Sequence, residues 1–389
     1  MKIRAIEDLH CDAGWRVWSF LKITTDEGVT GWAEYNESYG SKGLTEVIRR
    51  MAEPLIGRDP RPVELITSEL YALTRQAPGG VIRQAIAAIE NALTDIKARA
   101  LDIPVHDLFG GPCRDRLRLY WSHCGSYRLQ HHDKIGSPQL TSLEGVKELG
   151  AEVREKEFSA LKMNIYLFEE TGPRLFMPGF TISEGWPELN ADRSLLRIID
   201  KQLHAIRDGE GDDMDLCLDT NFNFKTEGYR RIANLLDQHD MMWMEIDLFN
   251  PEALALIREE ADTPIASCES LFGRREFLPY FQAQSMDVCI VDVPWNGIYE
   301  SCKVASMAET FETNCAPHNF YGNLSTAMSA HFCAAIPNYR IMEIDIDDVP
   351  WKDDVVTPPT IEDGHLIMNR KPGWGVVVNE DAIRAHPPN

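Results

Sequence analysis

The sequence lacks paired cysteines, a long apolar run and an excess of basic residues. Its nine cysteines are scattered singly with no C-x-x-C spacing, so we expect reduced core residues rather than disulfides or a zinc site. No run reaches the roughly 18 apolar residues that a membrane-spanning helix needs. The first residues, MKIRAIEDLHCD, carry charges where a signal peptide needs an apolar core. We therefore expect a cytoplasmic protein.

The charge balance disfavours two classes of partner. The chain has 39 Lys and Arg against 61 Asp and Glu, for a formal net charge of -22. Because this field repels nucleic acid and anionic membranes, we expect neither as a partner. No G-x-G-x-x-G follows a predicted strand, which disfavours a nicotinamide oxidoreductase. A small anionic substrate would need a local reversal of charge, which a metal ion and buried lysines can supply.

The N-terminal part has the pattern of an α+β unit. Residues 16–35 alternate apolar and polar positions around Asp26-Glu27-Gly28, as a β-hairpin does. Helical spacing follows from Leu44 to about Leu101. The glycine-containing segment 107–112 ends this pattern, so residues 1–115 are expected to form one domain.

The middle of the chain alternates short strands with helices, which predicts a (β/α) barrel over residues 116–354. A chain of 389 residues accommodates both units, since a barrel needs about 250 residues. The tail, 355–389, contains Pro358-Pro359 and Pro372-Gly373, and we expect an irregular segment that packs back on the first domain. The eight strand candidates are 117–125, 158–166, 214–221, 241–247, 263–270, 286–293, 313–319 and 339–345.

One interval breaks the barrel rhythm. Lys162 and Asp219 are 57 residues apart, and the excess includes an aromatic, proline-containing stretch at 165–190. Such a composition predicts an ordered insertion at the rim of the barrel rather than a solvated linker. It would either cover the site or form a subunit contact.

Polar residues recur at the strand ends. Asp219, Glu245, Glu269, Asp292, His318 and Glu343 close successive apolar runs, with gaps of 26, 24, 23, 26 and 25 residues. One strand, one helix and two loops occupy such an interval, so these residues should share one rim of the barrel. Acids gathered there require neutralisation, and the first three suit a hard, octahedral ion such as Mg²⁺.

The next two strands predict an acid–base pair. Asp292 could orient His318 and raise its basicity, which makes His318 a candidate base. Lys162 follows Ala160-Leu161 on the second strand, and a buried lysine there could stabilise a developing oxyanion. His123 ends the first strand and could be a second acid or a structural residue.

Together these residues resemble the mandelate racemase subgroup of the enolase superfamily. The resemblance includes TTDEGVTGWAE (24–34), AIAAIENALTDIKARALDIPVHDLFGG (85–111) and IVDVPWNGI (290–298). It implies a capping α+β domain over a modified (β/α)₇β barrel. It also implies Mg²⁺ held by Asp219, Glu245 and Glu269, and a carboxylate substrate that forms an ene-diolate.

One departure from the family pattern bears on the reaction. Where members often have Lys-x-Lys, this chain has Lys162-Met163-Asn164, and asparagine cannot take a proton. The Lys-x-Asn pattern resembles acid-sugar dehydratases, in which loss of the α-proton precedes loss of the β-hydroxyl. Asn164 and Asn221 would then bind substrate, and its carboxylate would contact Mg²⁺, Lys162 and Glu343.

Other readings stay open. A racemase, epimerase or cycloisomerase of the same superfamily would use the same ene-diolate, and a barrel that binds metal and ligand without turnover is a second alternative. The resemblance implies that Trp15, Arg16 and Tyr39, in loops of the capping domain, cover the distal end of the substrate. The aromatic insertion and the resemblance both favour a homo-oligomer.

Overall fold

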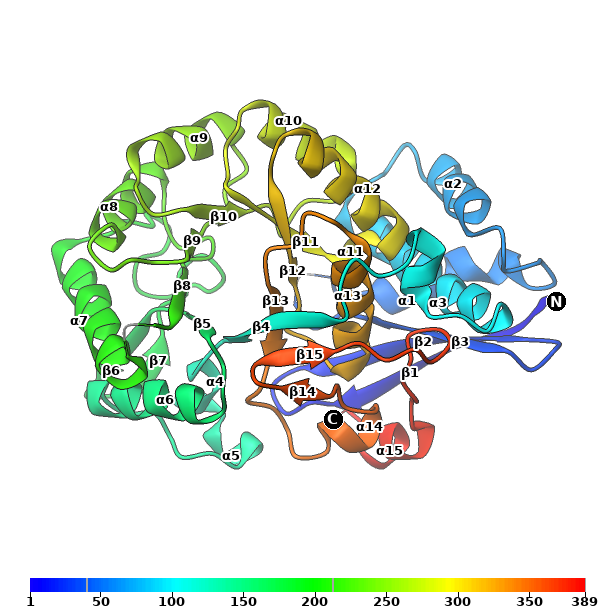
Figure 1. Cartoon of the computed structure of the whole chain (residues 1–389), viewed down its shortest axis with the longest axis horizontal. Coiled ribbons are helices and arrows are strands. Elements are labelled where there is room, and N and C mark those ends of the chain that lie inside the picture. The colour runs from blue at the N-terminus through cyan, green and yellow to red at the C-terminus, as the bar shows by residue number, and fades with distance from the viewer. Residues whose placement is uncertain (40, 212, 389) are drawn as a thin grey trace.

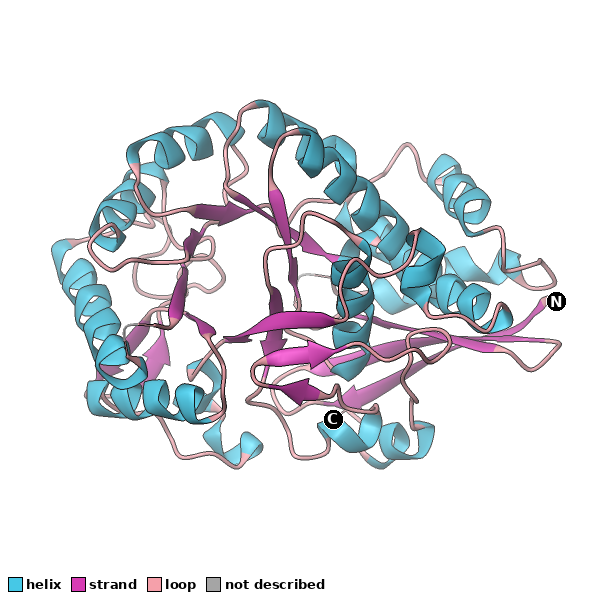
Figure 2. Ribbon diagram, viewed as in Figure 1, coloured by secondary structure: helices cyan, strands magenta, loops and turns pink. Residues whose placement is uncertain are grey.

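A ring of parallel strands wrapped by helices lies beside a smaller unit built on an antiparallel sheet (Figure 1). The computed structural model describes residues 1–39, 41–211 and 213–388. Figure 2 shows the helices forming an arc outside the ring of strands, which is the barrel architecture that the strand spacing predicted. Within the described residues, no helix combines the length and apolar character needed to cross a membrane.

The N-terminal unit contains the predicted hairpin and one strand more. β2 (Val17–Thr25) pairs antiparallel with both β1 (Ile3–Asp12) and β3 (Thr30–Tyr35). The predicted helical region forms α1 (Leu44–Ala52), the 3₁₀ turn η1 (Glu53–Leu55), α2 (Val63–Leu73), α3 (Gly80–Ala100) and the 3₁₀ turn η2 (Val105–Phe109). Apolar residues at three- and four-residue steps along α3 pack against the sheet, giving this unit its own core.

All eight predicted barrel strands are present. The hydrogen-bonded order is β12-β11-β10-β9-β8-β5-β4, and β13 pairs with β4. A bridge between Cys315 and Tyr339 links β12 to the segment that leads into β13, which completes the ring. The strands are β4 (Arg116–Ser122), β5 (Ala160–Met163), β8 (Asp215–Asp219), β9 (Trp243–Glu245), β10 (Ile265–Ser267), β11 (Val288–Asp292), β12 (Asn314–His318) and β13 (Met342–Asp345).

Helices cover the outside of the ring, and most of the longer ones turn one apolar face toward it. In α7, Leu195, Ile199, Leu203 and Ile206 are buried at helical spacing, and Asp192 caps the first turn by accepting from the Leu195 N–H at 2.7 Å. The helices are α4 (Ser126–Gln130), α5 (His132–Ile135), α6 (Leu143–Glu155), α7 (Arg193–Glu210), α8 (Thr226–Leu236), α9 (Pro251–Glu260), α10 (Arg274–Gln282), α11 (Val293–Asn296), α12 (Ile298–Thr310) and α13 (Asn323–Ala335).

Strand alternation explains why polar residues gather at one rim. A buried cluster contains one or two residues from each barrel strand or the segment leading into it, so these side chains fill the inside of the ring. Because side chains two positions apart lie on the same side of a strand, the next inward residue reaches the carboxyl end. Inward pairs of this kind are Ala160 and Lys162, Cys217 and Asp219, Trp243 and Glu245, Ile290 and Asp292, Ala316 and His318, and Ile341 and Glu343.

A buried carboxylate joins the capping unit to the barrel. Glu34, on β3, accepts from the N–H groups of Gly322 (2.7 Å) and Ser325 (2.9 Å) at the start of α13. Those N–H groups have no partner within the helix, and the helix dipole favours a negative charge there. Burial nevertheless raises the pKa of Glu34 to about 7. The contact holds the capping unit against the segment that follows His318.

Part of the tail is more regular than the sequence predicted. After α14 (Lys352–Val355), which ends at the first residue of the tail, the chain forms β14 (Ile361–Glu362), β15 (His365–Ile367) and α15 (Glu380–Ala385), and β15 adds antiparallel to the barrel strand β4. The same tail contacts the capping unit, because the Trp374 indole donates to the Trp32 carbonyl at 2.8 Å. Most of the tail is irregular, as expected, and β15 is regular because the amino end of β4, ahead of the residues that pair with β13, supplies its backbone partners.

The insertion begins as a hairpin. β6 (Tyr166–Glu169) pairs antiparallel with β7 (Gly172–Leu175), and the chain then turns back along the loop that follows β8. Asn223 in that loop accepts from the Gly179 N–H at 3.0 Å and donates to the Phe176 carbonyl at 3.0 Å. The segment is therefore ordered, as predicted, and it borders the residues after Asp219.

Candidate active site

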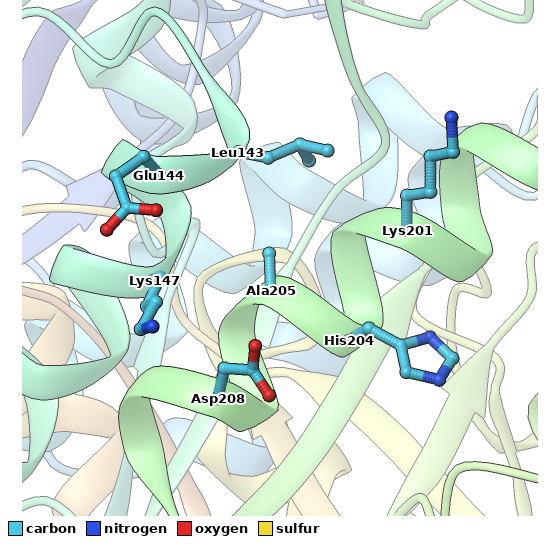
Figure 3. Close-up of a pocket in the computed structure, with 7 residues that line it drawn as sticks. All are labelled: Leu143, Glu144, Lys147, Lys201, His204, Ala205 and Asp208. Carbon is cyan, nitrogen blue, oxygen red and sulfur yellow. The ribbon is translucent and has the colours of Figure 1, made fainter.

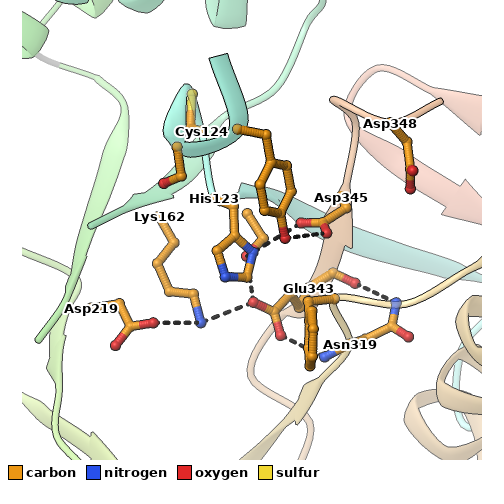
Figure 4. A network of polar contacts seen from close by, with 12 residues as sticks. His123, Cys124, Lys162, Asp219, Asn319, Glu343, Asp345 and Asp348 are labelled. Atoms are coloured by element: carbon orange, nitrogen blue, oxygen red, sulfur yellow. Dashed lines mark hydrogen bonds and ion pairs between the residues drawn. The ribbon is translucent and has the colours of Figure 1, made fainter. Parts of the chain in front are cut away.

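Four charged side chains from four strands meet at the carboxyl rim of the barrel. The Lys162 ammonium lies 2.8 Å from Glu245, 2.9 Å from Glu343 and 3.9 Å from Asp219. Figure 4 shows Lys162 between Asp219 and Glu343, with each joined to it by an ion pair. Lys162 is only 2 % exposed, so these contacts are shielded from water. The burial predicted for this lysine is confirmed.

The carboxylates of this rim are not fully neutralised. Burial raises the pKa of Glu245 to about 8, and repulsion from Asp219 and Glu269 adds to the effect, although Lys162 opposes it. Burial raises the pKa of Asp219 as well. For Glu343, Lys162 and the two nearby histidines outweigh burial and hold the pKa well below its usual range. The positive charge of Lys162 therefore does not offset burial and mutual repulsion at Asp219 and Glu245.

Glu269 reaches the rim by a different route from the other acids. It lies three positions after the inward-facing Ala266, and Cys268 between them has φ +92°. This left-handed residue changes the direction of the chain just after β10. Glu269 then lies 3.5 Å from Nε2 of His318, which joins the acids to the candidate base.

His318 forms the predicted pair with Asp292. Neighbouring parallel strands place the two residues in register, and His318 Nδ1 lies 2.7 Å from an Asp292 oxygen. The Tyr321 hydroxyl donates to the same oxygen at 2.5 Å. Burial lowers the pKa of His318, but Glu269 and Asp292 outweigh burial and raise it to about 10. Nε2 therefore faces the acids while Asp292 orients the ring.

The two asparagines lie together beside the acids. Asn164 donates to the Asn221 side chain at 3.4 Å and accepts from the Ser126 hydroxyl at 2.7 Å. The Asn221 N–H donates to Asp219 at 2.9 Å. Both are buried, and neither amide can exchange a proton at neutral pH, which limits them to binding.

Two of the predicted capping-unit residues converge on Phe320, next to His318. Arg16 donates to the Phe320 carbonyl, and the Tyr39 ring lies 5.9 Å from the Phe320 ring. Trp15 instead packs on Tyr127, with ring centroids 4.3 Å apart. Arg16 is 5 % exposed and forms ion pairs with barrel acids, so its contacts join the two units.

The donor set at the rim fits a hard cation. Asp219, Glu245 and Glu269 offer oxygen atoms alone, and a divalent ion would relieve the burial and repulsion that raise the pKa of Asp219 and Glu245. These acids do not converge as tightly as metal-bound ligands do, because Lys162 holds Glu245 and His318 contacts Glu269. Within the described ranges, the one group of three side chains whose ligand atoms all lie within 4.8 Å is Asp200, His204 and His239.

That histidine-containing group is remote from the rim. His239 precedes β9, at the amino end of the strand, whereas Glu245 lies at its carboxyl end. His204 lies on α7, on the outside of the barrel, next to a surface pocket of about 310 Å³ between α6 and α7. Figure 3 shows the residues that line the pocket, among them His204 and Asp208, and none belongs to the rim. This outer pocket is therefore separate from the candidate active site.

Two acids of the site were missed from the sequence. Asp247 follows Glu245, and Asp345 follows Glu343, each two positions later in the same triplet, Glu-Ile-Asp. Burial, with repulsion from Glu269, raises the pKa of Asp247 well above its usual value. Residues two apart on a strand share a face, so the repeated triplet was a readable signal for both.

Comparison with known families agrees with this arrangement. The model described as "Enolase C-terminal domain-like" matches residues 146–382, and the N-terminal domain model of mandelate racemase and muconate lactonizing enzyme matches residues 15–110. The chain belongs to the enolase superfamily, in its mandelate racemase subgroup.

Curated relatives of similar length are sugar-acid dehydratases. D-xylonate dehydratase of Haloferax volcanii is 28 % identical, over 95 % of this chain and 85 % of that protein. D-gluconate dehydratase of Thermoproteus tenax is also 28 % identical, over 97 % of this chain and 72 % of that protein. These relatives bring the chain close to acid-sugar dehydratases, as the Lys-x-Asn pattern suggested.

The solved structures include a nearer neighbour with a different name. A protein from Burkholderia xenovorans strain LB400, provisionally named L-alanine-DL-glutamate epimerase, is 46 % identical, with a TM-score of 0.98 over 100 % of this chain and 99 % of that chain. A second structure of that name, with a TM-score of 0.97 over 100 % of this chain and 96 % of the other, contains magnesium and fumarate. The fold is therefore shared over the whole chain. The name of this neighbour indicates epimerisation, whereas the names of the curated relatives indicate dehydration.

Proposed function

We propose that this chain is a Mg²⁺-dependent acid-sugar dehydratase. The observation that supports it best is the His318–Asp292 pair, whose Nε2 faces Glu269 at a rim that also carries Lys162 and further carboxylates. Two-base racemisation would need a second lysine at the position of Asn164. Because asparagine cannot transfer a proton, elimination after proton removal by a single base is favoured.

The chain's own residues divide the chemistry between them. Although burial lowers the pKa of His318, its raised value reflects the uncompensated charge of Glu269 beside it, so the ring is available in its neutral form once that charge is balanced. Neutral His318 takes the α-proton of a sugar-acid carboxylate, and Asp292 orients the ring and stabilises the protonated form that results. Lys162 donates to the carboxylate oxygens as the ene-diolate develops, and Glu343 holds the lysine. Asn164 and Asn221 bind the substrate. Loss of the β-hydroxyl then yields water and an enol that becomes a 2-keto-3-deoxy acid.

Asp219, Glu245 and Glu269 would hold Mg²⁺. The bound ion would supply the positive charge that lowers the energy of the ene-diolate. We expect Glu269→Gln to lower Mg²⁺ affinity by at least about tenfold, as loss of an anionic ligand does. His204→Ala is the matched control, because its group of metal-binding type lies outside the barrel. An unchanged affinity in Glu269→Gln, or a loss in His204→Ala, would move the ion away from the rim.

Epimerisation is the second candidate, because the 46 % identical Burkholderia protein carries an epimerase name. The two reactions share proton removal and differ in the fate of the ene-diolate. The test incubates the protein and Mg²⁺ in D₂O with D-xylonate, D-gluconate, D-galactonate and L-Ala-L-Glu, followed by NMR. A 2-keto-3-deoxy product supports dehydration. Deuterium at the α-carbon without a new carbonyl supports an isomerase, and binding without exchange supports a non-catalytic barrel.

His318→Asn separates the base from the rest of the site. It should abolish α-proton exchange and leave Mg²⁺ affinity nearly unchanged, because asparagine cannot accept the proton. His365→Asn, at the partly buried first residue of β15, is the matched control and should exchange at the rate of the unaltered protein. Retained exchange in His318→Asn would remove His318 from the role of base.

A further inference from the structure

A second imidazole–carboxylate pair borders the same rim. His123 follows β4, and its Nδ1 lies 3.0 Å from Asp345, which ends the neighbouring strand β13. Figure 4 shows the His123 ring beside Lys162, with Asp345 on its other side. The arrangement repeats that of His318 and Asp292, in which a buried carboxylate binds Nδ1 and leaves Nε2 for the site.

Asp345 is held in place as an anion. It is 3 % exposed, and its second oxygen accepts from the Tyr127 hydroxyl at 2.9 Å and from Arg16 at 3.2 Å. Burial raises the pKa of Asp345, but the His123 contact and Arg16 outweigh burial and lower it. The carboxylate therefore accepts the proton on Nδ1 of His123. Across the described part of the chain, no protein group hydrogen-bonds Nε2.

His123 and His318 face the same small region. Both rings lie near the Phe320 ring, whose centroid is 5.9 Å from that of His123 and 5.0 Å from that of His318. Both histidines also lower the pKa of Glu343, which is buried against Lys162. Two oriented imidazoles thus flank the residues that would contact the substrate carboxylate.

The backbone at His123 is also unusual. Its φ is +45°, a left-handed conformation that is strained for a residue other than glycine. Two hydrogen bonds of the turn hold it, from the Cys124 N–H to the Lys162 carbonyl at 3.0 Å and from the Ser126 N–H to the His123 carbonyl at 2.7 Å. The turn directs the ring toward the rim rather than outward along the strand.

We propose that His123, oriented by Asp345, is the second proton-transfer group of this site and acts on the β-hydroxyl. This inference rests on the proposed dehydratase function. His318 removes the α-proton, and the electron pair of that C–H bond forms the ene-diolate. The pair then forms the new C–C double bond as the β-carbon–oxygen bond breaks. His123 enters this step as an imidazolium, with Nδ1–H donated to Asp345 and a second proton on Nε2, and the leaving oxygen takes the Nε2 proton to become water. The enol ketonises, and solvent returns both histidines to their starting protonation.

The variant His123→Asn separates this role from a structural one. An asparagine amide can replace Nδ1–H as donor to Asp345, so the contact with Asp345 is kept. Asparagine has no group that replaces Nε2. With an acid that the protein dehydrates, His123→Asn should keep α-proton exchange in D₂O and lose at least about 100-fold in 2-keto-3-deoxy product. Asp345→Asn should lose product with the same pattern but less severely.

Two results would overturn the inference. Product formation by His123→Asn at the rate of the unaltered protein would show that Nε2 transfers no proton. Loss of exchange together with product, at unchanged Mg²⁺ affinity, would show that His123 acts before the ene-diolate forms. In contrast, loss of product with exchange retained is expected only of a group that acts on the leaving oxygen.

The failure of the dehydratase proposal would be recognised separately. If the unaltered protein exchanges the α-proton and forms no carbonyl, it is an isomerase. A His123→Asn variant that then exchanges one epimer without forming the other would still support His123 as the second group. If no acid is turned over, ¹⁵N NMR of the histidines with Mg²⁺ and fumarate tests whether His123 and His318 face the same bound acid. The Nε2 signals of His123 and His318 should both shift, and a shift of His318 alone would refute the inference.

Discussion

Replacing Lys162 by methionine tests the charge balance of the rim. Methionine nearly keeps the volume of the lysine and removes its charge, leaving Glu245 and Glu343 without the ammonium at 2.8 and 2.9 Å. Removing one partner of a buried ion pair typically lowers stability by about 3–5 kcal/mol, because the remaining charge is not compensated. Lys162 is 2 % exposed, so water cannot replace it and the full range applies.

The expected loss depends on metal. In EDTA, Lys162→Met should unfold at lower urea concentration, with a free energy of unfolding about 3–5 kcal/mol below that of the unaltered protein. In saturating Mg²⁺ the difference should narrow, because the ion supplies positive charge to the same carboxylates and stabilises the folded state by mass action. Lys371→Met, at an exposed lysine of the tail, is the control for a lost charge. An equal loss in EDTA and in Mg²⁺, or no loss in either, would refute the reasoning.

Three further outcomes are expected. Tyr321→Phe removes the hydroxyl that donates at 2.5 Å to the carboxylate of the histidine pair, and should lower kcat about tenfold with Mg²⁺ affinity intact; an unchanged kcat would contradict it. Burial raises the pKa of Glu90 to about 8 against an unfolded value near 4.5, so its contribution to stability is full below pH 4.5 and is lost as pH rises through 8. Between pH 6 and pH 8, the free energy of unfolding of Glu90→Gln should therefore fall by about 2 kcal/mol less than that of the unaltered protein, as measured by urea unfolding at each pH. An equal fall in both proteins would contradict the raised pKa of Glu90. In Gly209→Ala the new Cβ would lie 1.8 Å from the Lys147 carbonyl oxygen, whereas in the control Gly79→Ala nothing lies within 4 Å of the new Cβ. The melting temperature of Gly209→Ala should therefore be well below that of Gly79→Ala. Equal melting temperatures would show that α6 and α7 do not pack this closely.

The barrel and most of its rim were predictable because they follow from local periodicity. One strand and one helix occupy a near-constant length, so residues such as Asp219 and Glu245 recur at that interval and end in register. Alternation along each strand then selects which side chain faces inward. Neither rule requires knowledge of contacts between distant segments, which explains why the eight strands were found.

What the sequence did not reveal depends on distant contacts. Asp345 is held as an anion partly by Arg16, which lies 329 residues away in the sequence. That contact exists only once the capping unit is docked on the barrel. The strand β15 forms because the amino end of β4 extends beyond the residues that pair with β13, which the pattern of the tail does not encode. Glu269 reaches the rim through the left-handed residue Cys268, and no propensity of cysteine predicts that conformation.

The position of the metal tests the account most directly. Crystals grown with Mn²⁺, which takes the oxygen ligands of Mg²⁺ and scatters anomalously, would reveal the ion in a difference map. The account predicts a peak enclosed by Asp219, Glu245 and Glu269, with Nε2 of His318 free to face a bound acid. A peak only at Asp200, His204 and His239, or no peak at the rim in saturating ion, would contradict it.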